Sequence, residues 1–393
     1  MNHSTWNKKT VADIGKFLGG ATPSTTVPAY WNGGIHWTTS KRLGGSYFLD
    51  SGERFISKLG LDNSSTNLVP RGNLLIGTRV GVGKVAVNRV DMAISQDMTG
   101  VIVDRDQFNP LFLAFCLSQP EIQTQIIQQA RGVTIKGIPR EDLKLMEFRA
   151  PQKPEQEKIA AVLWKIQHSI EVEEKIAATV RDLKQSAIRQ LFTHGIRNES
   201  QKETEIGLVP KSWRVDRLVE FAHFQRGFDI TKKSQKIGKV PVVSSGGIRS
   251  WHDEAGAKGP GVIVGRKGSI GTVHYVEQDY WPHDTTLWCT DFRGNIPVFV
   301  YYRLQVLDLK KLDSGATNPA LNRNFLHEEI ISWPEPDEQK EIAAILQTID
   351  RKISVHERKR AALTDLFQTL LHQLMTAQIR VDKLDIDTSE VTT

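Results

Sequence analysis

The chain has 393 residues, 39% of them hydrophobic and 24% charged, which suffices for two or three ordinary globular domains. Its formal net charge of +6 permits nucleic acid as a partner without requiring it. Only two cysteines, Cys116 and Cys289, occur, so a disulfide framework and a cysteine metal site are excluded. No apolar signal core or membrane-length apolar run is present, and we expect a soluble protein of the cytoplasm.

Residues 1–150 predict a mixed α+β block. Short apolar runs at 74–76, 84–87 and 101–103 are typical of strands, and glycine-, serine- and threonine-rich stretches separate them. The segments 110–118 and 120–130 each begin with proline and favour short helices. Pro151 and Pro154 then mark the end of the block.

The stretch 154–193 predicts one long helix, and the chain contains this stretch twice. Residues 155–163 recur as residues 338–346, and the offset, 338 − 155 = 183, holds without a gap over roughly forty residues. Such a repeat indicates an internal duplication. Each copy carries the narrow apolar seam of a helix that pairs with another helix, and its charged flanks disfavour a helix buried in an ordinary core. The predicted helix-pairing seam is Ile159, Leu163, Ile166 and Ile170 in the first copy and Ile342, Leu346, Ile349 and Ile353 in the second.

The predicted order of segments is block, helix, block, helix. Its domains are a first block at 1–150, a central helical spacer at 151–195, a linker at 196–212, a second block at 213–333, a C-terminal helical spacer at 334–381 and a disordered acidic tail at 382–393. The blocks carry net charges of +5 and +3, while 151–212 and 334–393 carry +1 and −3. If the helices pair antiparallel, a pseudo-twofold axis relates the blocks and matches the approximate twofold of duplex DNA. This predicts a split, asymmetric target with an unread gap.

Basic, amide and hydroxyl side chains recur beside glycines and after short strands at matching places in the two blocks. Residues 74–79 parallel residues 262–267, and Asp97 is expected to correspond to Asp284. Arginine and lysine suit guanine and phosphate, and asparagine suits adenine. For any one of these residues alone a solvated loop charge is the simpler explanation, but their recurrence at matching places in both blocks favours DNA binding for the set. The predicted DNA-binding residues are Thr39, Lys41, Arg42, Arg79, Lys84, Arg131, Lys136, Arg226, Ser244, Ser245, Arg249, Arg266, Lys267, Asn318, Asn322 and Arg323.

Several motifs together resemble the specificity subunit of type I restriction–modification systems, over about residues 6–381. They are the helix starts at 151–156 and 334–339, the stretch 207–213 that opens the second block, residues 19–23, and the paired Gly-x-Thr segments at 132–134 and 315–317. The first block departs from the pattern, because it lacks a Gly-x-x-Pro opening and keeps only Trp6.

The resemblance implies an α+β fold in which two mixed α/β target recognition domains are separated by two long helices, paired as an antiparallel coiled coil with pseudo-twofold symmetry. Each domain would read one half of a bipartite double-stranded DNA target. The helices would set the spacer and dock two modification methyltransferase subunits, with restriction endonuclease subunits outside them. S-adenosylmethionine would belong to the modification partner, and ATP and Mg to the restriction partner. This chain itself would be non-catalytic, with no cofactor and no metal.

Two other classes of function remain as alternatives. One is a coiled-coil adaptor or scaffold without nucleic-acid function. The other is a self-contained nuclease or methyltransferase, which the motifs disfavour: residues 109–112 lack the second proline of an adenine methyltransferase motif, and residues 77–84 miss the glycine spacing of a P-loop. The eleven histidines show no metal-ligand spacing.

Overall fold

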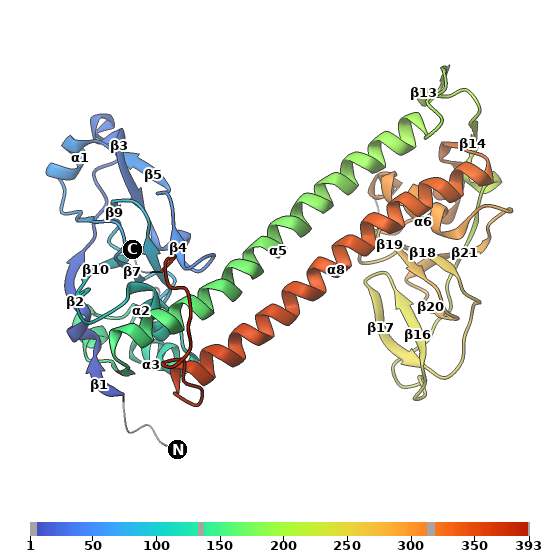
Figure 1. Cartoon of the computed structure of the whole chain (residues 1–393). Helices are drawn as coiled ribbons and strands as arrows, with labels where there is room; N and C mark the ends of the chain where they lie inside the picture. Colours follow the sequence, from blue (N-terminus) through green and yellow to red (C-terminus); the bar gives the residue numbers. More distant parts are fainter. Residues whose placement is uncertain (1–5, 133–136, 313–318, 392–393) are drawn as a thin grey trace. The chain divides into compact units, whose positions relative to one another are not determined.

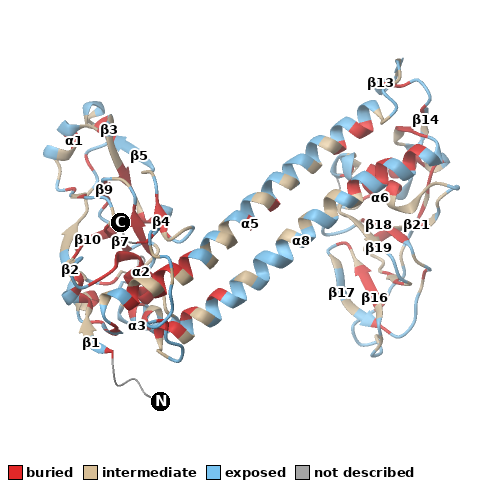
Figure 2. Ribbon diagram, in the orientation of Figure 1, coloured by how far each residue is buried: buried red, intermediate tan, exposed pale blue. Residues whose placement is uncertain are grey.

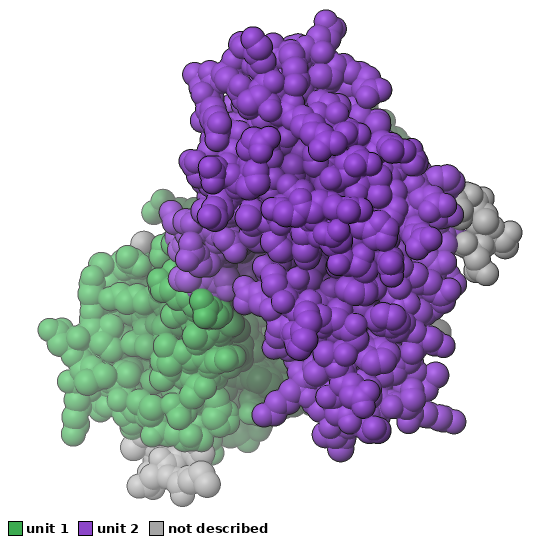
Figure 3. Space-filling model, turned by 90° about the vertical axis from the view of Figure 1, so that its right-hand side faces the viewer, with its two compact units in different colours: residues 1–175, 358–393 green, residues 176–357 purple. Residues whose placement is uncertain are grey.

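A computed structural model describes residues 6–132, 137–312 and 319–391. The chain forms two compact units, distinguished by colour in Figure 3: unit 1 is residues 1–175 with 358–393, and unit 2 is residues 176–357. Both predicted long helices are present, as α5 (Lys153–His194) and α8 (Pro336–Met375) (Figure 1). Among the described residues, no helix has the length and apolarity needed to cross a membrane.

Unit 1 is built on a five-stranded sheet in the order β2-β10-β7-β8-β4 and a four-stranded sheet in the order β5-β3-β9-β6. The predicted strands and short helices of this block are confirmed. Its strands are β1 (Asn7–Thr10), β2 (Gly15–Gly19), β3 (Trp31–Thr38), β4 (Phe48–Leu49), β5 (Arg54–Ile56), β6 (Leu68–Val69), β7 (Leu74–Gly77), β8 (Val85–Asn88), β9 (Met92–Ile94), β10 (Met98–Val103) and β11 (Glu147–Ala150). Its short helices are η1 (Val11–Ile14), η2 (Pro28–Tyr30), η3 (Ser40–Arg42), α1 (Lys58–Asp62), α2 (Pro110–Leu117), α3 (Pro120–Gln129) and α4 (Arg140–Lys144).

Unit 2 repeats the same strand orders in smaller sheets, β15-β21-β18-β19 and β17-β16-β20. In both units the second sheet contains one parallel pair, β3 with β9 and β16 with β20. The strands of unit 2 are β12 (Gln201–Thr204), β13 (Gly207–Pro210), β14 (Arg214–Arg217), β15 (His223–Arg226), β16 (Val240–Ser244), β17 (Gly247–His252), β18 (Gly261–Gly265), β19 (Val273–Val276), β20 (Trp281–Pro282), β21 (Thr286–Asp291) and β22 (Ile330–Trp333). Its short helices are η4 (Leu218–Glu220), α6 (Pro297–Val306), η5 (Leu309–Leu312) and α7 (Arg323–Glu328). The combination of sheets and helices in each unit confirms the predicted α+β class.

A buried glutamine fastens the start of each long helix to the block that precedes it. Gln156 accepts a hydrogen bond from the backbone N–H of Asn109 at 3.0 Å and donates one to the carbonyl of Pro151. Gln339, the same position in the second copy, accepts from the N–H of Ile296 at 2.9 Å and donates to the carbonyl of Pro334. The repeat therefore extends from the sequence to individual hydrogen bonds.

Within each unit, the first turns of one long helix pack against the last turns of the other. The core of unit 1 joins Ile159 and Leu163 to Phe367 and Leu371, with Ile166 and Ile170 half-buried beside it. The core of unit 2 joins Ile342 and Leu346 to residues of α5 that include Leu191, with Ile349 half-buried. Figure 2 shows these buried positions near the helix ends.

The middle of each helix differs from a continuous apolar seam. Ile353, the last predicted seam residue, is half-buried and belongs to neither core cluster. Ion pairs link the helices there instead. In unit 1 Lys359 Nζ contacts Glu173 at 2.5 Å, and in unit 2 Lys184 Nζ contacts Asp350 at 2.7 Å.

Two segments, the linker and the C-terminal tail, differ from their predicted irregular character. The linker 196–212 contains an antiparallel hairpin, β12 with β13. The acidic tail, predicted to be disordered, packs against unit 1: Val391 is buried, Ile386 is half-buried against the core, and Asn109 Nδ2 donates to the carbonyl of Val391 at 2.6 Å. The charges of the tail favour disorder, but the burial of Ile386 and Val391 between them stabilises the packed state.

Candidate nucleic-acid interface

The turn between β18 and β19 carries two of the predicted cations of unit 2. It lies where the strands of the larger sheet end, and we call this row of strand ends the edge of the sheet. The backbone N–H groups of Arg266 and Lys267 both donate to the carbonyl of Thr285, at 2.8 and 3.1 Å. The carbonyl of Arg266 in turn accepts from the N–H of Leu321 at 2.9 Å, which places Asn322 directly after this contact. Three loops far apart in sequence therefore meet at one edge.

The tip of the β16–β17 hairpin joins the same edge. Ser245 N–H donates to Thr285 Oγ1 at 3.3 Å, and Ser244 Oγ donates to the carbonyl of Gly247 at 3.0 Å. The register between these strands shifts so that Val243 pairs with Ile248 and Val242 with Ser250. Arg249 is thus the extra residue of a β-bulge, a device that re-aims a side chain relative to the sheet.

Arg226, at the end of β15, completes this cluster. Its Nη2 contacts Asp284 Oδ2 at 3.0 Å. Arg266 lies half-buried nearby, and burial, together with the positive charge of Arg226, lowers the pKa of its guanidinium. Arg266 Nη1 has no hydrogen-bond partner among the described residues. A buried donor without a partner is costly, so this atom is well suited to donate to a ligand.

The same edge contains one group with metal-ligand chemistry. Asp229, His283 and Asp284 offer ligand atoms that lie within 4.8 Å of one another. The guanidinium of Arg226 already pairs with Asp284, so an added cation would compete with a charge that is in place. The sequence did not reveal this group because Asp229 comes from a different loop.

Unit 1 presents the same backbone frame with other side chains. The N–H groups of Thr78 and Arg79 donate to the carbonyl of Asp97 at 2.8 and 3.2 Å, and the carbonyl of Thr78 accepts from Ile138 N–H at 2.8 Å. Asp97 therefore corresponds to Thr285, and the predicted match of Asp97 with Asp284 is wrong by one residue. The expectation rested on like side chains, whereas the shared contact uses the backbone carbonyl.

A pocket of about 630 Å³ lies at this edge of unit 1. It includes Arg79 and Arg131, two of the predicted residues, and Arg131 Nη2 contacts Asp142 at 2.7 Å. Two residues that the prediction missed, Gln96 and Arg140, also line it. Gln96 and Arg140 come close to the predicted cations only in the folded chain. The sequence offered one signal for either residue, the position of Gln96 at the end of a strand.

Several predicted residues lie elsewhere or are otherwise engaged. Lys41 and Arg42 are exposed in η3, and Thr39 Oγ1 donates to Glu53 at 2.7 Å. Lys84 lines a different pocket of unit 1, beside Phe367 of α8. The remaining four are Asn322, which caps α7, Arg323, which begins α7 and is exposed, and Lys136 and Asn318, which lie outside the described residues.

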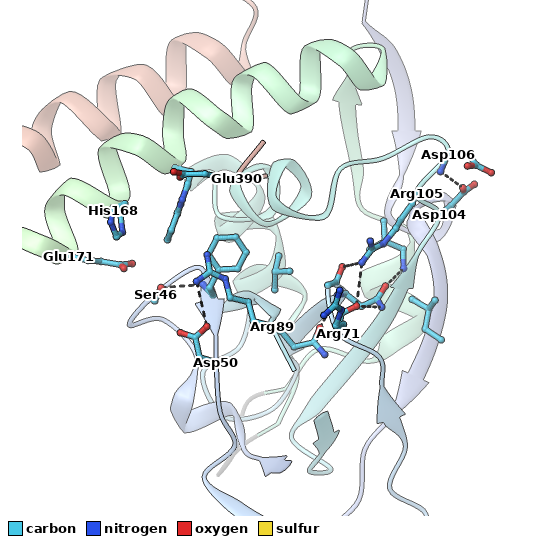
Figure 4. A pocket seen from close by; sticks show the side chains of 18 of the residues that line it. Ser46, Asp50, Arg71, Arg89, Asp104, Arg105, Asp106, His168, Glu171 and Glu390 are labelled. Atoms are coloured by element: carbon cyan, nitrogen blue, oxygen red, sulfur yellow. Dashed lines mark hydrogen bonds and ion pairs between the residues drawn. The ribbon is translucent and has the colours of Figure 1, made fainter. Parts of the chain in front are cut away.

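A larger pocket of unit 1, about 1100 Å³, has a mixed lining that suits DNA less well (Figure 4). The Arg89 guanidinium lies 3.8 Å from the centroid of the Phe48 ring and contacts Asp50 at 3.5 Å. Trp164 of α5 also borders the pocket, with its ring at 4.6 Å from that of Phe48. At the repeat offset of 183, Gln347 takes the place of Trp164 in the second helix. The aromatic wall is therefore not part of the repeat.

The sequence model of one protein family, the type I restriction modification DNA specificity domain, matches residues 3–181 and 210–365, which are most of both units. The chain belongs to this family. As a family member it is 27% identical to the type I restriction enzyme MjaIX specificity subunit of Methanocaldococcus jannaschii over 249 residues, 61% of this chain and 57% of that relative. It is 22% identical to the MjaVIII specificity subunit of the same organism over an alignment of 415 positions, gaps included, which covers 97% of this chain and 94% of that relative.

The resemblance stated from the sequence is thereby confirmed. A solved structure has the same fold, the S subunit of a type I restriction–modification system from M. genitalium. It superposes with a TM-score of 0.70 at 18% identity over 95% of this chain and 97% of that one. The family description favours DNA recognition over an adaptor without nucleic-acid function.

Proposed function

We propose that this chain is the DNA-recognition subunit of a type I restriction–modification complex and that each unit reads one half of a bipartite, asymmetric target. The observation that carries this proposal is the repeated backbone frame. In both units a strand-end turn donates two N–H groups to one carbonyl, at Asp97 in unit 1 and at Thr285 in unit 2. The surrounding side chains differ, so similar scaffolds present different chemistry to the two half-sites.

The long helices serve as a spacer. Within each unit the start of one helix lies against the end of the other, which supports an antiparallel pair with pseudo-twofold symmetry. A helix rises about 1.5 Å per residue, so forty residues correspond to roughly 60 Å. In this proposal the helix length fixes the unread gap between half-sites.

The helix surfaces also offer room for partner subunits. Among the described residues of α8, none from 347 to 366 is buried in this chain, and Val355 and Leu366 are 50% and 45% exposed. A helical stretch of this length that its own chain leaves uncovered is accessible to a protein partner. In this proposal two modification methyltransferase subunits dock there and restriction subunits join outside them. S-adenosylmethionine belongs to the former and ATP with Mg to the latter, while this chain is not catalytic and binds no cofactor.

The test uses the full chain with its modification partner. Sequencing of methylated DNA defines the motif, and duplexes carrying it with the gap lengthened or shortened by one base pair are compared in binding. Because one base pair shifts and rotates the second half-site, we expect specific affinity to fall to the level of random duplex. Equal affinity for all gap lengths would refute the spacer. The adaptor alternative predicts no methylated motif and no salt-dependent DNA affinity.

A further inference from the structure

The structure assigns a matched pair of positions, Gln96 in unit 1 and Asp284 in unit 2, that determine which base each half-site selects, and the sequence pattern identified neither as DNA-binding. This inference rests on the proposed function and names the side chains that distinguish the two half-sites.

The backbone establishes the equivalence of the two positions. Gly77 N–H donates to the carbonyl of Lys84 at 2.8 Å, and Gly265 N–H, 188 residues later, donates to that of Thr272 at 2.7 Å. The same offset relates the carbonyls of Asp97 and Thr285, each of which accepts two N–H groups. Gln96 and Asp284 immediately precede these carbonyls, so they occupy the same place in each frame.

A second contact supports the match. In unit 1 the N–H of Ala21 donates to the carbonyl of Ile94 at 2.9 Å, and in unit 2 the N–H of Phe228 donates to that of Pro282 at 2.8 Å. The residues that follow these donors are Thr22 and Asp229. Thr22 Oγ1 donates to Gln96 Oε1, while Asp229 lies close to Asp284 and His283. The paired positions are hydrogen-bonded in unit 1 and lie within 4.8 Å in unit 2, and their chemistry changes together.

A guanidinium accompanies each position but comes from a different element. In unit 2 it belongs to Arg226 on β15, 3.0 Å from Asp284. The corresponding residue of unit 1 is Gly19, where an added Cβ would lie 2.6 Å from Arg140 Nη2. Arg140 of α4 therefore fills the space that a side chain at position 19 would need. Its buried Nε has no partner among the described residues, and it lines the same pocket as Gln96.

The two sets suit different bases. The Gln96 amide offers a donor and an acceptor, the combination that pairs with the N7 and N6 edge of adenine. In unit 2 the carboxylate of Asp284 holds Arg226, whose fork of donors matches O6 and N7 of guanine. Gln96 thus reads adenine in one half-site, and Asp284 acts as a positioning residue for Arg226, which reads guanine in the other.

The test measures discrimination at every position of the methylated motif. Binding of the complex with its modification partner is compared across duplexes that each carry one substituted base pair. We expect Gln96→Ala to reduce discrimination about 10- to 100-fold at a single A·T pair of one half-site. Arg226→Ala should do so at a single G·C pair of the other. Asp284→Asn should weaken the same G·C preference, and Arg226→Lys should lose it as Arg226→Ala does, because a point charge lacks the bidentate fork.

Matched controls separate these effects from folding. Gln128→Ala removes an amide from an exposed position of α3 and should leave the whole discrimination profile unchanged. Unchanged discrimination in Gln96→Ala, or a loss in both half-sites, would overturn the assignment while the proposed function stands. If the wild-type complex shows no base discrimination at any position, the proposed function itself fails.

Discussion

The indole Nε1 of Trp213 donates a hydrogen bond of 3.1 Å to Oε2 of Glu338, and both side chains are buried. Glu338 lies in the first turn of α8, while Trp213 opens the second globular block. The other oxygen of the carboxylate, Oε1, accepts from the N–H of Ile196 at 3.0 Å, and Arg197 Nε lies 3.7 Å from Oε2. One carboxylate therefore ties together the start of α8, the end of α5 and the block that follows it.

Unit 1 has the equivalent contact at the repeat offset. Glu155 accepts from Arg380 Nη2 at 2.8 Å, and 380 − 197 equals 338 − 155. Hydrogen bonding to Glu155 raises the pKa of Arg380, which keeps the guanidinium charged. The two glutamates thus fix corresponding helix ends in both units, and their removal should loosen the helix pair.

Glu338→Gln should destabilise unit 2. Glutamine has nearly the same shape, but its NH2 group replaces one carboxylate oxygen and so faces an N–H donor that then lacks an acceptor. We therefore expect the free energy of opening to fall by about 2–3 kcal/mol. Hydrogen exchange of peptides from unit 2 measures this loss. Glu341→Gln, one turn along the helix and exposed, is the control. Equal protection in the two variants would show that the buried carboxylate contributes little.

Leu163→Asp should unfold unit 1 far more readily than Leu183→Asp. Leu163 is completely buried and Leu183 is 57% exposed, although both lie on α5. Truncation of a buried leucine costs about 2–5 kcal/mol, and burial of an unpaired carboxylate adds to this. Circular dichroism during urea denaturation checks the difference. A similar midpoint for both variants would contradict the assignment of Leu163 to the core.

The helical part of this architecture was predictable because its signals are local. The apolar spacing of residues 159–170, and its recurrence at 342–353, indicates helix and duplication without any knowledge of the tertiary fold. The ion pairs that replace the seam in mid-helix were less visible, since Lys184 and Asp350 are far apart in sequence and become partners only when the helices pair.

The candidate site was predictable only in part for the same reason. Glycines beside Arg266 and Lys267 indicate a turn that can approach phosphate, and the structure brings these residues together with Ser245 and Arg226. Gln96 carries only the weak signal of its strand-end position, and Asp284 is matched by residue type with Asp97 rather than with Gln96. Their equivalence follows from backbone hydrogen bonds between strands, and residue-type matching shifted the alignment by one position.

Stability of unit 2 should fall below neutral pH through His327. Its Nε2 accepts from Phe224 N–H at 2.9 Å, and burial, followed by the charges of His223 and Arg323, lowers its pKa below the usual value of about 6.5. The unfolded chain therefore binds a proton at a pH where the folded chain does not. The stabilising contribution is complete above about pH 6.5 and is lost as the pH falls through the folded-state pKa.

Chemical denaturation from pH 7.5 to 5 compares wild type with His327→Gln, whose amide oxygen can accept the same hydrogen bond without titrating. We expect the variant to lose less stability than wild type over this range. Parallel pH profiles for the two proteins would exclude His327 as a source of the dependence.

Lys267→Ala should weaken DNA binding without changing which bases are read. Lys267 is exposed beside Arg266 and is held at the sheet edge by its N–H bond to Thr285, a position suited to a phosphate contact. Loss of one phosphate contact reduces the slope of log affinity against log salt by about 0.9. Titrations of the complex with its modification partner between about 50 and 200 mM salt measure this slope. Arg293→Ala, at the opposite end of β21, should leave the slope unchanged. An unaltered slope in Lys267→Ala, or an equal change in Arg293→Ala, would show that the DNA does not contact the β18–β19 turn.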